Sequence, residues 1–196
     1  MNTEAHLPNF DDRKQMWESV AFNQCKTKFP HAERYIRKLR NLYSNGAVEF
    51  MSFGMPKHRI WDWYSSRNQY HELGFFKYFW CHSDVVKHFP HKLDDINFFD
   101  MKVFNHSSPY VLGGELAWIL VGGGAYKQFK GQGNEAKKIG EEAAAELIDD
   151  NYDQVLVYHS GSAWCSFFYD VAWDHSFVVF DQRRHLIHVI LATDTD

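Results

Sequence analysis

The sequence predicts a single α+β domain, in which helices pack on a mostly antiparallel sheet of about five or six strands. Hydrophobic residues make up 45% of the 196 residues, as is usual for a globular protein. A chain of this length buries roughly 70% of the surface that its unfolded form exposes, so it can build its own core. Helical spacing dominates the first half, and the end of the chain reads as one helix followed by short strands. We therefore expect one domain over residues 1–196.

Residues 1–92 are expected to form a helical region rich in aromatic residues. A first helix is predicted after Asp11 or Asp12, either of which can cap it, and it ends before Pro30. A second helix is predicted over residues 32–43, where apolar residues recur at helical spacing: Tyr35, Ile36, Leu39 and Leu42.

Residues 50–92 are the most aromatic part of the chain, and their pattern leaves the secondary structure open. Pro56 can stand in the first turn of a helix, and Ser83 can cap a short helix that ends at Pro90. Aromatic residues such as Trp61 can be core residues or anchors for a partner. Apolar neighbours on both sides favour the core.

Residues 93–196 are expected to supply the sheet and one clear helix. The alternation over residues 97–105 and the apolar run 115–121 each predict a strand. A helix is predicted at about 134–149 from core-facing positions in steps of three or four: Ala136, Ile139, Ala143 and Leu147. Four further strands are predicted, joined by short links that favour antiparallel pairing: 154–159, 165–173, 176–181 and 185–193.

The charge is unevenly distributed along the chain. Residues 1–95 carry a net charge of +3, whereas residues 96–196 carry −7. An acidic half is poorly suited to bind nucleic acid, because phosphates need cationic partners. It is compatible with a basic protein partner, and equally with an acidic face that serves only solubility.

The cysteines and the apolar runs predict in which cellular compartment the protein resides. Cys25, Cys81 and Cys165 are odd in number and widely spaced, which predicts reduced thiols in a reducing compartment. The first eight residues are polar, and the longest apolar run covers only about six residues, 116–121. We therefore expect a cytoplasmic protein with no membrane segment.

No complete catalytic or cofactor motif is present. The glycine-rich stretches 122–124 and 131–133 have lysines nearby, but neither has the spacing of a nucleotide-binding loop, so turns explain them more simply. Ser160 and Ser162 do not stand in a nucleophile-elbow motif. A loose group of possible metal ligands lacks the paired spacing of a structural zinc site: Cys81, His82, His88 and His91. We expect no cofactor and no metal.

The strongest candidate site lies in residues 168–175. As a strand, this stretch would place aromatic residues on one face and two carboxylates on the other, with a histidine at the edge. Such a group can bind a partner, perform acid–base chemistry or hold a metal, or it can be a solvated strand face. The predicted binding residues are Trp164, Tyr169, Asp170, Trp173, Asp174 and His175, and we name no catalytic residue.

The leading functional prediction is a non-enzymatic, intracellular protein-binding module. Its most specific form is an immunity- or antitoxin-like inhibitor that covers a basic toxin or nuclease with the acidic, aromatic C-terminal half. One alternative is a small hydrolase or metal-dependent enzyme that uses Asp170, Asp174 and His175. Another is a regulatory domain whose aromatic residues line a ligand pocket. The partner and the oligomeric state stay open.

Overall fold

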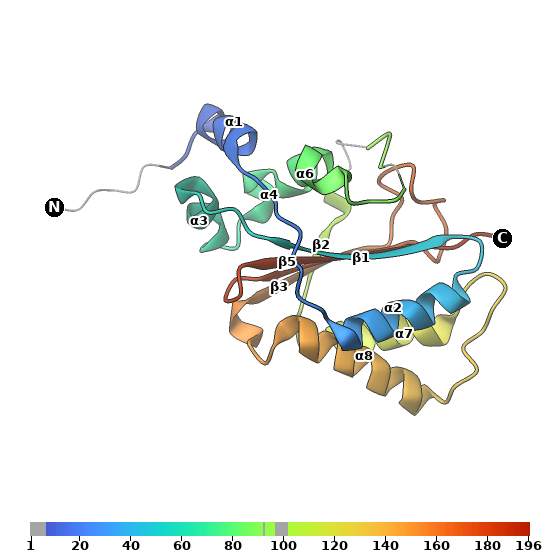
Figure 1. Cartoon of the computed structure of the whole chain (residues 1–196). Coiled ribbons are helices and arrows are strands. Elements are labelled where there is room, and N and C mark those ends of the chain that lie inside the picture. Colours follow the sequence, from blue (N-terminus) through green and yellow to red (C-terminus); the bar gives the residue numbers. More distant parts are fainter. Residues whose placement is uncertain (1–6, 92, 97–101) are drawn as a thin grey trace.

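The structure is a computed structural model that describes residues 7–91, 93–96 and 102–196. It confirms the α+β prediction: a five-stranded antiparallel sheet lies between two layers of helices (Figure 1). The strand order is β1-β5-β4-β3-β2. The strands are β1 (Ala47–Gly54), β2 (Asn105–Ser107), β3 (Val155–Ser160), β4 (His175–Asp181) and β5 (Leu186–Thr193).

The sheet draws on both halves of the chain. β1 belongs to the region predicted as helical, yet it forms one edge of the sheet and pairs antiparallel with β5 in the register Ala47↔Thr193. β4 and β5 are antiparallel neighbours, as the short link between them predicted, and β3 pairs antiparallel with β4 across the longer segment 161–174. These strands are buried on both faces because helices cover both, and this explains their nearly continuous apolar sequence.

The lower layer in Figure 1 consists of three longer helices. They are α2 (Pro30–Leu42), α7 (Leu112–Gly122) and α8 (Gly133–Ile148). α2 and α8 match the predicted helices closely. α7 corrects the strand predicted at 115–121, because a short apolar run does not by its periodicity distinguish a buried strand from a helix. Its inward side is helical in spacing: Leu112, Leu116, Ile119 and Leu120.

α7 and α8 cross with their backbones close together. A Cβ atom at Gly140 would overlap the carbonyl oxygen of Gly113 and the backbone of Ala117. One at Gly113 would meet the side chain of Glu141. Small residues at positions 113 and 140 therefore let the two helices approach, whereas a Cβ atom at Gly114 would meet nothing within 4 Å.

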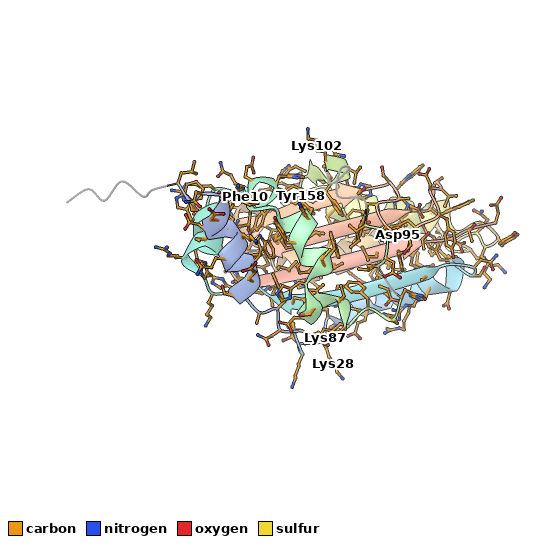
Figure 2. All side chains as sticks on the ribbon, turned by 90° about the horizontal axis from the view of Figure 1, so that it is seen from above. Phe10, Lys28, Lys87, Asp95, Lys102 and Tyr158 are labelled. Carbon is orange, nitrogen blue, oxygen red and sulfur yellow. The ribbon has the colours of Figure 1, made fainter. Side chains whose placement is uncertain are left out.

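The upper layer consists of shorter helices on the opposite face of the sheet, so helices cover both faces. They are α1 (Phe10–Ser19), α3 (Arg59–Ser65), α4 (Tyr70–Leu73), α5 (Phe75–Tyr78), the 3-10 helix η1 (Phe79–Cys81) and α6 (Ser83–Val86). α3 does not begin at Pro56 as predicted, because the side chain of His58 caps it by accepting from the amide of Ile60. Figure 2 looks down on this layer, with Lys28, Lys87 and Lys102 projecting from its margins.

Two hydrophobic cores result, one on each face of the sheet. The upper core is dominated by aromatic rings, such as Phe75 stacked on Phe79 at 4.5 Å between centroids and Tyr70 stacked on Phe180 at 3.7 Å. The lower core is mainly aliphatic, with alanines where α8 meets its neighbours. The aromatic residues of 60–80 are thus mostly core residues.

Two predicted strands need further comment. Residues 165–173 form consecutive bends and turns instead of the predicted strand, and Phe167 and Phe168 are both buried against the upper core. For the strand predicted at 97–105, residues 97–101 lie outside the described residues, and β2 begins only at Asn105.

Candidate functional site

The six predicted binding residues do not share one surface. Trp164 is 1% exposed, and its indole N–H donates to the Ser176 hydroxyl at 2.8 Å, so it is a core residue. Tyr169 is 54% exposed. Asp170 is exposed on a turn with φ of 60°, and Trp173 is partly buried against the lower core.

Asp174 is buried and serves the fold. One carboxylate oxygen accepts from the hydroxyl of Thr193 at 2.5 Å, and the other accepts from the amide of Val171 at 3.1 Å. This carboxylate therefore ties the turn before β4 to the end of β5. Because the segment is not a strand, Asp170 and Asp174 do not form the pair of carboxylates on one face on which the enzyme alternative depended.

Asp194 is likewise buried and forms structural hydrogen bonds. Its two oxygens accept from the amides of Asn45 at 2.9 Å and Ala125 at 2.8 Å. Burial, followed by the negative charges of Asp194 and Asp174, raises the pKa of the neighbouring Tyr43. These carboxylates thus lie near each other around a tyrosine that stays neutral, but each is already occupied by structural hydrogen bonds.

His175 has different partners from those predicted. Its ring lies 5.8 Å from the ring of His159 and nearly parallel to it, because β3 and β4 pair in the register Ser160↔Ser176. Burial and then the neighbouring His159 lower the pKa of His175 to about 4. Burial also lowers the pKa of His159, and the negative charge of Glu115 on α7 partly opposes that shift.

Glu115, His159 and His175 together form a half-buried polar group beneath α7. One oxygen of Glu115 accepts from the Ser107 hydroxyl at 2.9 Å, but its other oxygen is buried without a hydrogen-bond partner among the described residues. The same is true of Nε2 of His159 and Nδ1 of His175. Both imidazoles are neutral near pH 7, so the group can exchange protons or hold a bridging water.

This polar group is not a preformed metal site. Within residues 7–91, 93–96 and 102–196, no three His, Cys, Asp or Glu side chains are placed so that they could hold a metal ion together. In the loose group of histidines and a cysteine near residue 82, the His82 ring is already engaged in hydrogen bonds. The His82 ring bonds the amide of Asp84 and the carbonyl of Val20, at 3.2 Å in each case.

The outer face of α7 is the most unusual surface in the described chain. Trp118 is 74% exposed there, with Val111 and Val121 also exposed on the same side. Tyr110 precedes the helix, is 71% exposed and stacks on Tyr152 at 4.6 Å between ring centroids. We call these four residues, Tyr110, Val111, Trp118 and Val121, the α7 face.

The α7 face was missed in the sequence because the run was interpreted as a buried strand. If the same residues are placed on a helix, Leu116 and Leu120 lie on one side and Trp118 lies on the other. A mostly apolar helix is normally buried, and large exposed apolar side chains on one mark a candidate interaction surface.

Acidic residues stand beside the N-terminal half of the α7 face. Glu141 on α8 lies against Gly113, and Asp153 follows the tyrosine that stacks on Tyr110. Neither carboxylate forms an ion pair with a described residue. Glu115 stands one helical turn before Trp118. This part of the surface therefore combines exposed aromatic rings with negative charge.

Comparison of the chain with protein families, with curated proteins and with solved structures found no match. No helix among the described residues is long and apolar enough to cross a membrane. The arguments for function therefore rest on the chain's own geometry.

Proposed function

We propose that this chain is a protein-binding module that holds a basic partner protein on the α7 face. The observation that carries the proposal is the exposure of Trp118 on a helix with apolar residues on every side. Tryptophan and tyrosine are the residues that most often supply the binding energy of an interface, because they bury large area at low entropic cost. The acidic residues beside them supply the charge complementarity that favours a basic partner.

The more specific form of the proposal is an immunity- or antitoxin-like inhibitor of a basic toxin or nuclease. Its support is chemical: the exposed Glu141 and Asp153 place negative charge beside the exposed rings, where it can pair with the lysines and arginines of a partner's phosphate-binding surface. The polar group of Glu115, His159 and His175 is shielded beneath α7, so it contributes to how the helix is seated rather than to direct contact.

The first experiment places a photo-crosslinking amino acid at Tyr110 in the cell that makes the protein. The matched control places it at Tyr169, which is also an exposed tyrosine but lies in the turns before β4. We expect a crosslink from position 110 to one basic polypeptide and none from position 169. A crosslink only from position 169 would instead support the surface predicted from the sequence, and crosslinks only to a second copy of the chain would contradict a basic partner.

The second experiment reconstitutes the complex from the two purified chains. Trp118→Ala should weaken binding roughly 30-fold or more, which corresponds to about 2 kcal/mol at a hot spot. Glu141→Lys should weaken it and reduce its dependence on salt, whereas Glu18→Lys on α1, on the opposite side of the sheet, should not. If the partner is a nuclease or toxin, its activity should fall in proportion to the complex formed.

A further inference from the structure

A cleft with a cationic lining lies between α2 and the loop that precedes α8. Its volume is about 850 Å³, and we call it the lysine cleft. It is lined by Lys38, Asn41, Leu42, residues 126–131 and Glu135. None of the four residues of the α7 face is among these, so the cleft is a separate feature and its function does not depend on the proposed partner.

We infer that the lysine cleft binds a small organic anion that carries a flat apolar ring and a phosphate or carboxylate group. Lys127 and Lys130 form no ion pair with a described residue, so both charges are available. Lys38 is only partly neutralised, because its ammonium lies 3.5 Å from a carboxylate oxygen of Glu135. Three lysines facing one carboxylate leave the lining positive, which favours an anion.

The remaining lining explains why the ligand should carry a ring. Leu42 is buried and contributes an apolar wall, and the ring of Phe129 is partly buried against the lower core. Tyr126 is 64% exposed, so its ring is available for stacking. A free inorganic anion would use the lysines and leave these apolar surfaces uncovered, whereas a ring would bury them.

The cleft is held in shape by contacts that do not depend on a ligand. The buried Asp194 carboxylate binds the amides of Asn45 and Ala125, and so joins the end of α2 to the loop that carries two of the lysines. Within that loop the amide of Gly124 donates to the carbonyl of Lys127 at 2.8 Å. A site that is already ordered loses less conformational entropy when it binds.

The start of α8 adds a smaller electrostatic contribution. Its N-cap, Gln132, makes no side-chain hydrogen bond to the first turn, so only the Glu135 carboxylate in that turn offsets the positive end of the helix dipole. Gly131 lines the cleft just before this turn, where a Cβ would overlap the ring of Phe129. Gly131 therefore serves the packing of the loop, and the lysines and rings supply the recognition.

The test titrates the full-length protein with phenyl phosphate and follows backbone amide signals by nuclear magnetic resonance. Phenyl phosphate should shift the signals of residues 126–131 in a saturable way and bind about tenfold more tightly than inorganic phosphate or phenol, since each supplies only half of the contacts. Benzoate, measured in parallel, tells whether a carboxylate serves as well as a phosphate; either anion with a ring fits the inference.

Matched variants locate the site. The double variant Lys127→Gln, Lys130→Gln should weaken phenyl phosphate binding about tenfold or more, and Tyr126→Ala should weaken it as well. Lys137→Gln removes one positive charge from α8 outside the lysine cleft, and should leave the affinity for phenyl phosphate unchanged. Binding that survives the double variant, or that is no tighter than for inorganic phosphate, would overturn the inference, as would the absence of saturable shifts at residues 126–131.

Discussion

The two cores of this protein solve the same packing problem with different residues. Above the sheet, short helices are held by interlocking aromatic rings, and each ring touches several others. Below it, three longer helices pack through leucines, isoleucines and small residues, so that α7 and α8 approach at Gly113 and Gly140. The upper core keeps its rings inside, whereas the lower layer presents Trp118 to the outside. The comparison indicates that aromatic packing dominates the core above the sheet, whereas the lower layer combines an aliphatic core with an exposed tryptophan on its outer face.

The largest expected effect comes from opening the aromatic core. Phe75 contacts rings from α1, α3, α4, η1 and β4, so Phe75→Ala should lower the free energy of unfolding by about 3–5 kcal/mol. Urea denaturation of the variant and of wild type gives the difference. Phe10→Ala removes a ring that is 62% exposed and should change the free energy of unfolding by less than about 0.5 kcal/mol. Equal effects would show that the upper core is not packed as described.

Low pH should destabilise the protein through two histidines on the lower side of the sheet. Burial and then the charge of Arg184 lower the pKa of His188 to about 3, and the pKa of His175 is about 4. In the unfolded chain both protonate near pH 6.5, so stability is full above that pH and is lost as pH falls toward the folded pKa values.

The two histidines together should therefore cost about 4 kcal/mol of unfolding free energy between pH 7 and pH 5. Urea denaturation at a series of pH values measures this. His175→Gln removes one titrating group and should flatten the pH dependence by about half, whereas Phe10→Ala removes no titrating group and should leave the slope as it is. A slope unchanged by His175→Gln would contradict the burial of its ring.

A smaller effect should follow from separating the two long helices. Gly140→Ala forces a methyl group against the backbone of α7 and should destabilise the protein by about 1–3 kcal/mol, despite the higher helix propensity of alanine. Gly133→Ala makes the same change in the same helix, where nothing lies within 4 Å, and should be neutral or slightly stabilising. Thermal denaturation of both variants is sufficient, and equal melting temperatures would rule out the close crossing.

The smallest effect on stability is expected where the effect on binding is largest. Trp118→Ala should change the free energy of unfolding of the isolated chain by less than about 0.5 kcal/mol, because the ring is 74% exposed. The same variant should lose the partner. If it unfolds as readily as Phe75→Ala, the ring is part of the core and the contrast between the two sides is wrong.

Local pattern was enough to predict some elements and not others. α8 and the strands β3 to β5 were predicted within one or two residues, because helical spacing and turn residues are local signals. α7 was predicted as a strand because a run of six apolar residues fits a buried strand as well as a helix. Only its packing against Gly140 distinguishes the two. The turns of residues 165–173 depend on the bond from Val171 to Asp174 and on a left-handed Asp170, which no alternation reveals.

The candidate sites were harder to predict because they join distant segments. His175 was predicted from the sequence as a binding residue, but its proximity to His159 depends on the register in which β3 and β4 pair. The lysines of the loop before α8 were noticed, yet Lys38 reaches them only because α2 packs on α8 in the lower layer. The exposure of Trp118 could have been inferred by testing a helical reading of residues 112–122.

The strand order has a consequence for the way the chain is made. Among the described strands β1 has a single neighbour, β5, although Gly54 and its partner Leu186 stand near opposite ends of the sequence. During synthesis β1 is therefore complete long before the strand that receives it has left the ribosome. The aromatic segment that follows β1 must remain uncovered for that interval, and the contacts that close the sheet form last. The sheet therefore cannot close before β5 has been synthesised, and until then the aromatic segment is open to aggregation.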